Sequence, residues 1–351
     1  MNHAFFSTNS PTFTHDDSQV IVVKENCGAS AARNLGLEQA SGTYVLFLDD
    51  DIVPDTDLLD AYIGATLRYP TANVLVGTAA LPQPVGLWQC AVASTQLAYF
   101  YTVASDMRRP PWGVTANLCV RRVLPGGVHH RFDTMFPKTG GGEDVDFCWQ
   151  YTSISPSTGP MSQPKRGKPP VAVPGARVTH PWWTAGHPCI GHIVGWSAGE
   201  TLLPDQWPDK TYRSVPMWCE ALLLAAPLAF YFASWSTVLH ATAAVVGTEL
   251  LLSTYAYYQH TEPTLSAPGR LLAAALGALI TAAQQTAGMS RHLRRGRVHN
   301  LCRRVDWFDG HRLAWRVKNQ REAMVRFILH LLAVALVFNT SSSFNSEYDG
   351  E

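Results

Sequence analysis

As far as about Ser214, the chain mixes short apolar runs with glycine, proline and acidic residues, which is the pattern of an α/β domain. Residues 20–23 and 44–48 are compact apolar runs suited to buried strands. Between them, a glycine-containing turn enters an alanine-rich helix that ends at about residue 40. A strand, a helix and a strand in this order predict a right-handed crossover and a parallel sheet. We therefore expect an α/β domain over residues 1–214.

Beyond residue 214 the pattern changes to long apolar stretches with little charge between them. A helix needs roughly 20 apolar residues to cross a bilayer. Three stretches are close to that length, at 215–235, 238–258 and 271–289, and a shorter fourth covers 324–338. Tryptophan, tyrosine and phenylalanine gather near the ends of these stretches, as they do at membrane interfaces. These features predict a membrane-associated helical region over 215–339 and a polar tail over 340–351.

Polar residues within the apolar stretches leave other interpretations open. Glu220, Glu249 and the pair Gln284 and Gln285 favour buried helices of a soluble bundle. A multi-span transport protein would instead place paired ionisable groups inside the spans, for which Glu220, Glu249 and His240 are the candidates.

A basic segment, residues 291–321, bears on which side of the membrane the first domain occupies. It contains Arg-His-Leu-Arg-Arg-Gly-Arg and suits a cytosolic membrane face beside anionic lipid. Three complete crossings would place this segment on the side opposite the first domain. If both face the cytosol, one apolar stretch lies in the interface or re-enters. Cytosolic and lumenal placement of the first domain both stay open, and the basic segment favours the cytosol.

Composition narrows the class of protein. The 351 residues carry 27 Lys+Arg and 27 Asp+Glu, which excludes a strongly basic nucleic-acid binder and an acidic disordered chain. Only 15% of the residues are charged, against about a quarter in an ordinary soluble domain. The seven cysteines form no C-x-x-C pair, so neither a disulfide framework nor a zinc knuckle is expected.

Three consecutive aspartates, Asp49, Asp50 and Asp51, follow directly after the predicted strand 44–48. Ligands of open α/β sheets bind beyond the carboxyl ends of the strands, which is where these acids stand. Their mutual repulsion destabilises the fold unless a cation or hydrogen-bond donors compensate. A divalent ion that bridges to a diphosphate is the natural compensator. The alternative is a solvated acidic turn.

A second acidic group follows a run of three glycines, Gly140 to Gly142. Glycine permits positive φ and a close approach of ligand to backbone, and a helix is expected to begin at Glu143 and Asp144. Acids in a first helical turn are often only partners of the helix dipole. In the functional interpretation, one of them is a general base that removes a proton from an acceptor hydroxyl.

Three motifs occur in a fixed order: Asn26-x-Gly28-x-x-x-Ala32-Arg33-Asn34-x-Gly36, Phe47-Leu-Asp-Asp-Asp51 and Gly142-Glu-Asp144-x-Asp146-Phe. In order and separation they resemble the family 2 glycosyltransferases of the GT-A fold, over roughly residues 15–200. The resemblance implies a mostly parallel sheet flanked by helices, followed here by the membrane helices. It implies inverting transfer of a hexosyl or related group from a nucleoside-diphosphate sugar to a hydroxyl acceptor.

The resemblance also implies roles for single residues. The donor nucleotide sugar would contact Arg33, Asn34, Asp49 and Asp50. A Mn²⁺ or Mg²⁺ ion would be held by Asp51 and His180. On the acceptor side, Asp144 would be the catalytic base and Glu143 would hydrogen-bond the acceptor. With a membrane region in the chain, a glycan or a lipid-linked acceptor is expected, and nucleic acid is not.

The beginning of the chain departs from the family pattern. Only about nineteen residues precede the apolar run 20–23, and the family's usual opening strand and turn are lacking. We therefore expect an N-terminally incomplete transferase domain, or a degenerate one. In the second case the chain would be a non-catalytic carbohydrate-binding or scaffold membrane protein.

Overall fold

The computed structural model describes residues 21–22, 25–124, 127–138, 140–153, 167–310 and 312–348. The chain divides into two compact units. The first takes its described residues from 1–84 and 96–203, and the second from 85–95 and 204–351. A segment inside the predicted first domain, 85–95, thus packs with the helical unit. Of the predicted strand 20–23, residues 20 and 23 lie outside the described part, and Ile21 and Val22 carry no strand.

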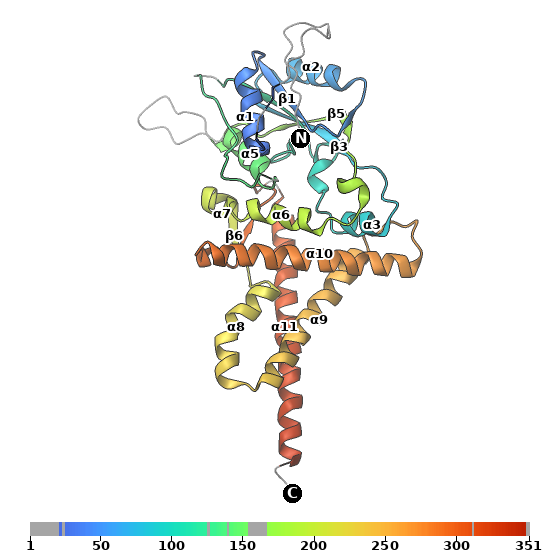
Figure 1. The fold of residues 1–351 in the computed structure, drawn as a ribbon, viewed down its shortest axis with the longest axis vertical. Helices are drawn as coiled ribbons and strands as arrows, with labels where there is room; N and C mark the ends of the chain where they lie inside the picture. The colour runs from blue at the N-terminus through green and yellow to red at the C-terminus, as the bar shows by residue number, and fades with distance from the viewer. Residues whose placement is uncertain are drawn as a thin grey trace. The chain divides into compact units, whose positions relative to one another are not determined.

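The first unit is built on a five-stranded sheet with the order β1-β4-β3-β5-β2 (Figure 1). Its strands are β1 (Tyr44–Leu48), β2 (Val53–Pro54), β3 (Val74–Ala80), β4 (Asn117–Arg121) and β5 (Val171–Thr179). Its helices are α1 (Ala29–Gln39), α2 (Leu58–Arg68), α4 (Val103–Asp106), α5 (Glu143–Ser153) and α6 (Ile190–Glu200), with short 3₁₀ turns at η2 (Tyr99–Tyr101) and η3 (Trp183–Gly186).

The prediction of a mostly parallel sheet was wrong. Only β3 and β5 pair in parallel, and the pairs β1–β4, β3–β4 and β2–β5 are antiparallel. Six of the seven residues of β3 are buried, as are four of the five of β4. A continuous apolar run indicates that both faces of a strand are covered, but it does not indicate the direction of the neighbouring strand. The α/β class and the flanking helices are confirmed.

One buried polar side chain, Asn117, ties the sheet together. Its Nδ2 donates to the carbonyl oxygens of Thr78 on β3 and Ala176 on β5, at 3.1 and 2.9 Å. Its Oδ1 accepts from the hydroxyl of Tyr62 on α2 at 2.7 Å. Asn117 is 0% exposed. Because water does not reach its amide, these hydrogen bonds supply the partners that a buried polar group needs. The amide therefore fixes β4, β3, β5 and α2 against one another.

The second unit is mainly helical. Its helices are α3 (Leu87–Ser94), α7 (Leu203–Gln206, which begins at the boundary), α8 (Trp218–Phe232), α9 (Trp235–Tyr258), α10 (Ala267–Arg294) and α11 (Leu313–Tyr348). The remaining elements are the strands β6 (Thr211–Arg213) and β7 (Arg303–Val305), which pair antiparallel, and the 3₁₀ turns η4 (Pro208–Lys210) and η5 (Val298–Asn300). Within this unit, α10 runs across the direction of α11 (Figure 1).

Three helices of the described chain are long and apolar enough to cross a membrane: Trp235–Tyr258, Ala267–Arg294 and Leu313–Asn339. They confirm the predicted stretches 238–258 and 271–289. The prediction for 215–235 was wrong, because α8 has only 15 residues and contains Pro227. At 1.5 Å per residue it measures about 22 Å, short of the roughly 30 Å hydrocarbon core. Conversely, 324–338 belongs to the much longer α11.

The acidic residues of the helical region have basic partners. Glu220 pairs with Arg304 at 2.5 Å and accepts from the backbone N of Cys302 at 2.9 Å. Glu249 pairs with Arg326 at 2.8 Å. The pair of Glu249 and Arg326 joins α9 to α11, and ionisable groups paired with one another are the form in which such residues are tolerated in a bilayer. These acids therefore do not weigh against membrane insertion.

Replacing Asn117 with leucine is expected to lower the free energy of unfolding by about 3 kcal/mol, since two carbonyls and a hydroxyl lose their partner in a dry interior. Thermal unfolding of the full chain in detergent, followed by circular dichroism, measures the effect. Tyr62→Phe is the matched control, because it removes one of the three hydrogen bonds and should cost about 1 kcal/mol. Equal stability of the parent and Asn117→Leu would contradict the assignment.

Candidate active site

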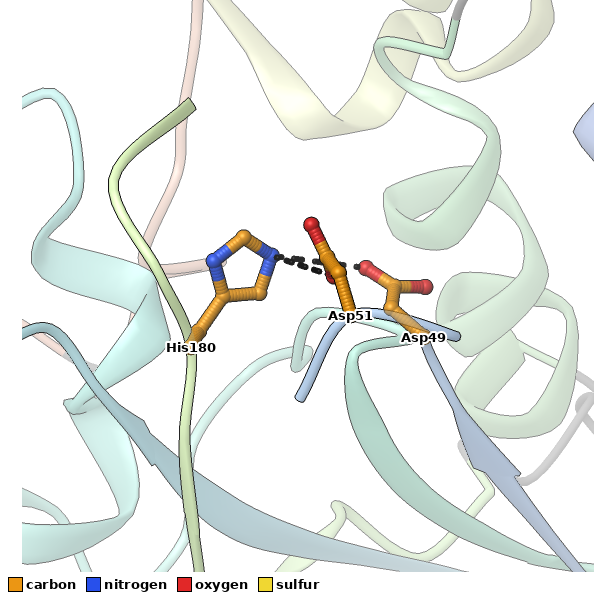
Figure 2. A group of neighbouring side chains, drawn as sticks. All are labelled: Asp49, Asp51 and His180. Atoms are coloured by element: carbon orange, nitrogen blue, oxygen red, sulfur yellow. Dashed lines mark ion pairs between the residues drawn. The ribbon is translucent and has the colours of Figure 1, made fainter. Parts of the chain in front are cut away.

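Asp49, Asp51 and His180 form a compact group at one edge of the sheet (Figure 2). One ligand atom from each residue lies within 4.8 Å of the others. The Nε2 atom of His180 is 3.7 Å from an Asp49 oxygen and 3.7 Å from an Asp51 oxygen. The three side chains point toward one another from the end of β1, the turn after it and the end of β5.

Strand pairing explains why Asp51 and His180, which are far apart in the sequence, meet. The two-residue strand β2 starts just after Asp51, and its Val53 pairs with Thr179 at the end of β5. The next residue, His180, donates its backbone N–H to the carbonyl of Ala80 at 2.9 Å. The pairing of β2 with β5 thus places the acidic turn beside the end of β5. There the hydrogen bond to Ala80 of β3 holds the backbone of His180.

The imidazole of His180 is oriented for binding a cation. Its Nδ1 lies 2.6 Å from the carbonyl oxygen of Pro181, which can only accept, so Nδ1 carries the hydrogen. In the neutral ring the lone pair of Nε2 therefore faces the two carboxylates. Burial lowers the pKa of His180, but Asp49, the Pro181 carbonyl and Asp51 outweigh it and raise the pKa overall. A proton or a metal ion balances this group.

The donor set fits a hard divalent ion. Two carboxylate oxygens and one imidazole nitrogen converge, and they leave the remaining positions of an octahedral ion open to water or phosphate oxygen. The ligand atoms are held by short segments directly attached to β1 and β5, so their positions are set by the sheet and not by a long loop. Asp50 is exposed and lies outside this group.

Arg33 joins the two acidic motifs. Its Nη1 lies 3.0 Å from Oε1 of Glu143, and its Nη2 lies 3.5 Å from Oδ1 of Asp49. The Arg33 side chain is 12% exposed and its guanidinium lies 5.5 Å from the ring centre of Phe132. Glu143 and Asp49 are separated by more than ninety residues in the sequence. We call Asp49, Asp51 and His180 the metal group, as the candidate ligands of an ion. A single guanidinium therefore joins this group and the start of α5 in one candidate site.

The glycine run before α5 adopts the backbone that the sequence predicts. Gly140, Gly141 and Gly142 have φ values of 87°, 109° and 86°, which L side chains rarely adopt. A Cβ on Gly141 would stand 2.7 Å from the backbone of Trp196. A Cβ on Gly199 would stand 1.4 Å from the carbonyl oxygen of Gly141. Helix α6 thus packs directly on the glycine run and holds the start of α5 in place.

The first two residues of α5 differ in exposure. Glu143 is 5% exposed, and its Oε2 has no hydrogen-bond partner among the described residues, while Oε1 is paired with Arg33. Asp144 is only partly covered, and its Oδ1 accepts from the backbone N of Val145 at 2.8 Å. Burial and the neighbouring Glu143 raise the pKa of Asp144, and Arg33 opposes this shift. Asp144 thus has the exposure and the raised pKa that proton transfer requires.

Aromatic rings lie beside the metal group. Tyr101 is 5.3 Å from the His180 ring and 5.6 Å from Trp183, between ring centres. Trp196 of α6 lies 5.2 Å from Trp183 and 5.2 Å from His192. His192 was not among the residues predicted for the site. The signal was available, because His192 and Trp196 are four residues apart and share one face of a helix.

Asn34 has a different place from the one its motif suggests. Its Nδ2 donates to the carbonyl of Phe132 and its Oδ1 accepts from the N–H of the same residue, both at 2.8 Å. Both ends of the amide are thus engaged with backbone. Asn34 holds the segment that carries the Phe132 ring, and Phe132 in turn stacks on Phe147 of α5 at 3.8 Å. Through Phe132, Asn34 therefore helps to position α5, whose first residues belong to the candidate site.

Comparison with known proteins bears on the first half of this site. Residues 11–112 match the family model described as "Glycosyl transferase family 2". The matched range contains Arg33 and the acidic turn, whereas Glu143, Asp144 and His180 lie beyond it. Searches of curated proteins and of solved structures returned no match. The chain thus contains a glycosyl transferase family 2 domain, followed by three long apolar helices.

Proposed function

We propose that the chain is a membrane-associated, metal-dependent, inverting transferase that moves a sugar from a nucleoside-diphosphate donor to a hydroxyl acceptor. The observation that most supports this proposal is the pair of contacts made by the Arg33 guanidinium. It contacts Asp49 of the metal group and Glu143 at the start of α5. Donor chemistry and acceptor chemistry need a common site, and this contact supports one. The alternative of two unrelated acidic turns gains no support from this arrangement.

The donor half of the proposal rests on the acidic turn and Arg33. Asp51, Asp49 and His180 would hold a Mn²⁺ or Mg²⁺ ion, which when bound stabilises the negative charge on the departing nucleoside diphosphate. Arg33 has a planar fork of donors that suits a diphosphate oxygen pair. Its longer contact, to Asp49 at 3.5 Å, is the one that a phosphate can replace.

The acceptor half rests on the first turn of α5. Asp144 removes the proton of the acceptor hydroxyl as its oxygen attacks the anomeric carbon and the bond to the diphosphate breaks. Glu143 directs the acceptor, because its Oε2 is buried and lacks a donor within the described part of the chain. Since the acceptor oxygen attacks directly, no enzyme nucleophile is required and the anomeric configuration inverts.

The helical region supports an acceptor that is found at a membrane, either a glycan under synthesis or a lipid-linked alcohol. Three helices have the length and apolar character for a membrane span. The basic segment 291–321 supports a cytosolic location for the membrane-proximal part of the helical unit.

Asp51→Ala is expected to weaken metal-dependent donor binding at least 10- to 100-fold, because a direct ligand matters at least as much as an outer-shell partner. Asp144→Asn is expected to keep donor binding within about twofold and to lower transfer by 10²- to 10⁴-fold, the usual contribution of a general base. Isothermal titration of the full chain with UDP- and GDP-sugars, with and without Mn²⁺, measures binding. Product formation with the same donors measures transfer.

Asp57→Ala is the matched control, since it removes the same charge from an exposed aspartate that lies outside the metal group and makes no side-chain capping hydrogen bond. It should resemble the parent in both assays. If no donor binds the parent with Mn²⁺, or if Asp51→Ala and Asp57→Ala have equal effects, the proposal is wrong and a non-catalytic carbohydrate-binding or scaffold protein is the better interpretation.

The rate of transfer should fall on acidification at a pH well above 3.9, where a free aspartate titrates. A base acts only when deprotonated, and burial and Glu143 raise the pKa of Asp144. Arg33→Gln removes the cation that opposes this shift, so the midpoint should move to higher pH. The measurement is kcat against pH at saturating donor and Mn²⁺, which separates this effect from weaker donor binding. A midpoint that stays or moves to lower pH contradicts the assignment of Asp144.

A further inference from the structure

An open groove of about 560 Å³ lies within the helical unit, between one face of α10 and the first residue of α8, Trp218. The indole Nε1 of Trp218 donates to Oε1 of Gln285 on α10 at 2.8 Å. This hydrogen bond fixes the aromatic side of the groove to the helix that forms its floor. The groove belongs to neither acidic motif and plays no part in the proposed transfer.

The floor of the groove changes character along α10. The contributing residues recur three and four positions apart, so they form a single stripe on one helix face. The stripe begins with Leu279 and continues through the small side chains of Ala283 and Ala287 to Arg291 and Arg294. From Leu279 to Arg294 it spans about 22 Å, at 1.5 Å per residue. One end is therefore apolar and the other is cationic.

The orientation of α10 suits a position at the membrane surface. It runs across α11 in the same unit, and so it cannot cross a bilayer that α11 spans along its axis (Figure 1). A helix with an apolar stretch and a basic end, lying in the plane of the membrane, places arginines at the level of the headgroups. This makes α10 the stretch that lies in the interface.

We propose that this groove binds one anionic phospholipid of the bilayer. The phosphate lies between Arg291 and Arg294, and an acyl chain follows the stripe past Ala283 to Leu279. Guanidinium groups bind phosphate oxygens in pairs, which matches the cationic end. Small side chains, namely alanines with Thr286 and Ser290, occupy the middle of the stripe, which leaves room for a chain. Trp218 has the apolar body and polar edge typical of interfacial sites.

Native mass spectrometry of the full chain tests this, from detergent micelles that contain equal amounts of phosphatidylglycerol and phosphatidylcholine. The parent should retain one phosphatidylglycerol in preference to phosphatidylcholine. Arg294→Gln should lower phosphatidylglycerol retention about fivefold, the equivalent of one basic residue at an anionic surface, and leave phosphatidylcholine unchanged. Ala283→Trp fills the groove and should lower retention of both lipids.

Arg295→Gln is the matched control, because Arg295 is the adjacent exposed arginine and does not line the groove. It should retain phosphatidylglycerol like the parent. Equal retention of the two lipids by the parent, or equal effects of Arg294→Gln and Arg295→Gln, overturns the proposal. Displacement of the lipid by millimolar glycerol phosphate also overturns it, since the site would then bind a free anion.

Donor titration of the same variants keeps this test separate from the proposed transfer. Arg294→Gln changes an exposed side chain, so we expect its thermal unfolding to match that of the parent. Its lipid retention therefore tests the proposal even if Ala283→Trp fails to fold. Loss of lipid with intact donor binding supports the lipid site whatever the outcome for transfer.

Discussion

The contacts of one largely covered guanidinium, that of Arg33, are the interaction on which the candidate site depends. Arg33 lies between Asp49 and Glu143, and these acids would repel each other at close range in a poorly hydrated place without it. At the other end of the site, Asp51 faces the lone pair of His180, and a proton or a divalent ion has to balance the charge. The protein thus neutralises one side of the candidate site with its own guanidinium and leaves the other to a proton or a cation.

The sequence predicts those parts of the site that depend on local structure. The acids at the end of β1 and the positive φ values of Gly140 to Gly142 follow from residue type and short-range pattern. Strand direction does not follow from them, because a buried strand such as β3 has the same apolar sequence pattern whether its neighbour is parallel or antiparallel. The hydrogen bonds of Asn34 could not be predicted from short-range pattern either, since its partner, Phe132, is 98 residues away in the sequence.

The helical region shows the same limit at helix ends. Apolar stretches were visible in the sequence, yet α8 ends at Phe232 because Ser234 caps the next helix, its hydroxyl accepting from the N–H of Thr237. A stretch of apolar residues of spanning length thereby became a 15-residue helix. In α11 the opposite happened, because polar residues before Met324 continue the helix without contributing to its apolar stretch. Apolar content and helix length are separate properties, and only the first is read directly from composition.

In the proposed reaction, the unequal contacts of Arg33 separate its two tasks. The 3.0 Å contact with Glu143 is the stronger, so it persists when a diphosphate competes for the guanidinium, whereas the 3.5 Å contact with Asp49 yields. The Oδ1 atom of Asp49 is then free of Arg33 when the donor is bound, while its Oδ2 atom keeps its place beside His180. Because Glu143 stays paired, the surroundings of Asp144 change little, and its raised pKa is retained while the acceptor enters. In this proposal, donor binding therefore frees one oxygen of Asp49 without disturbing the base.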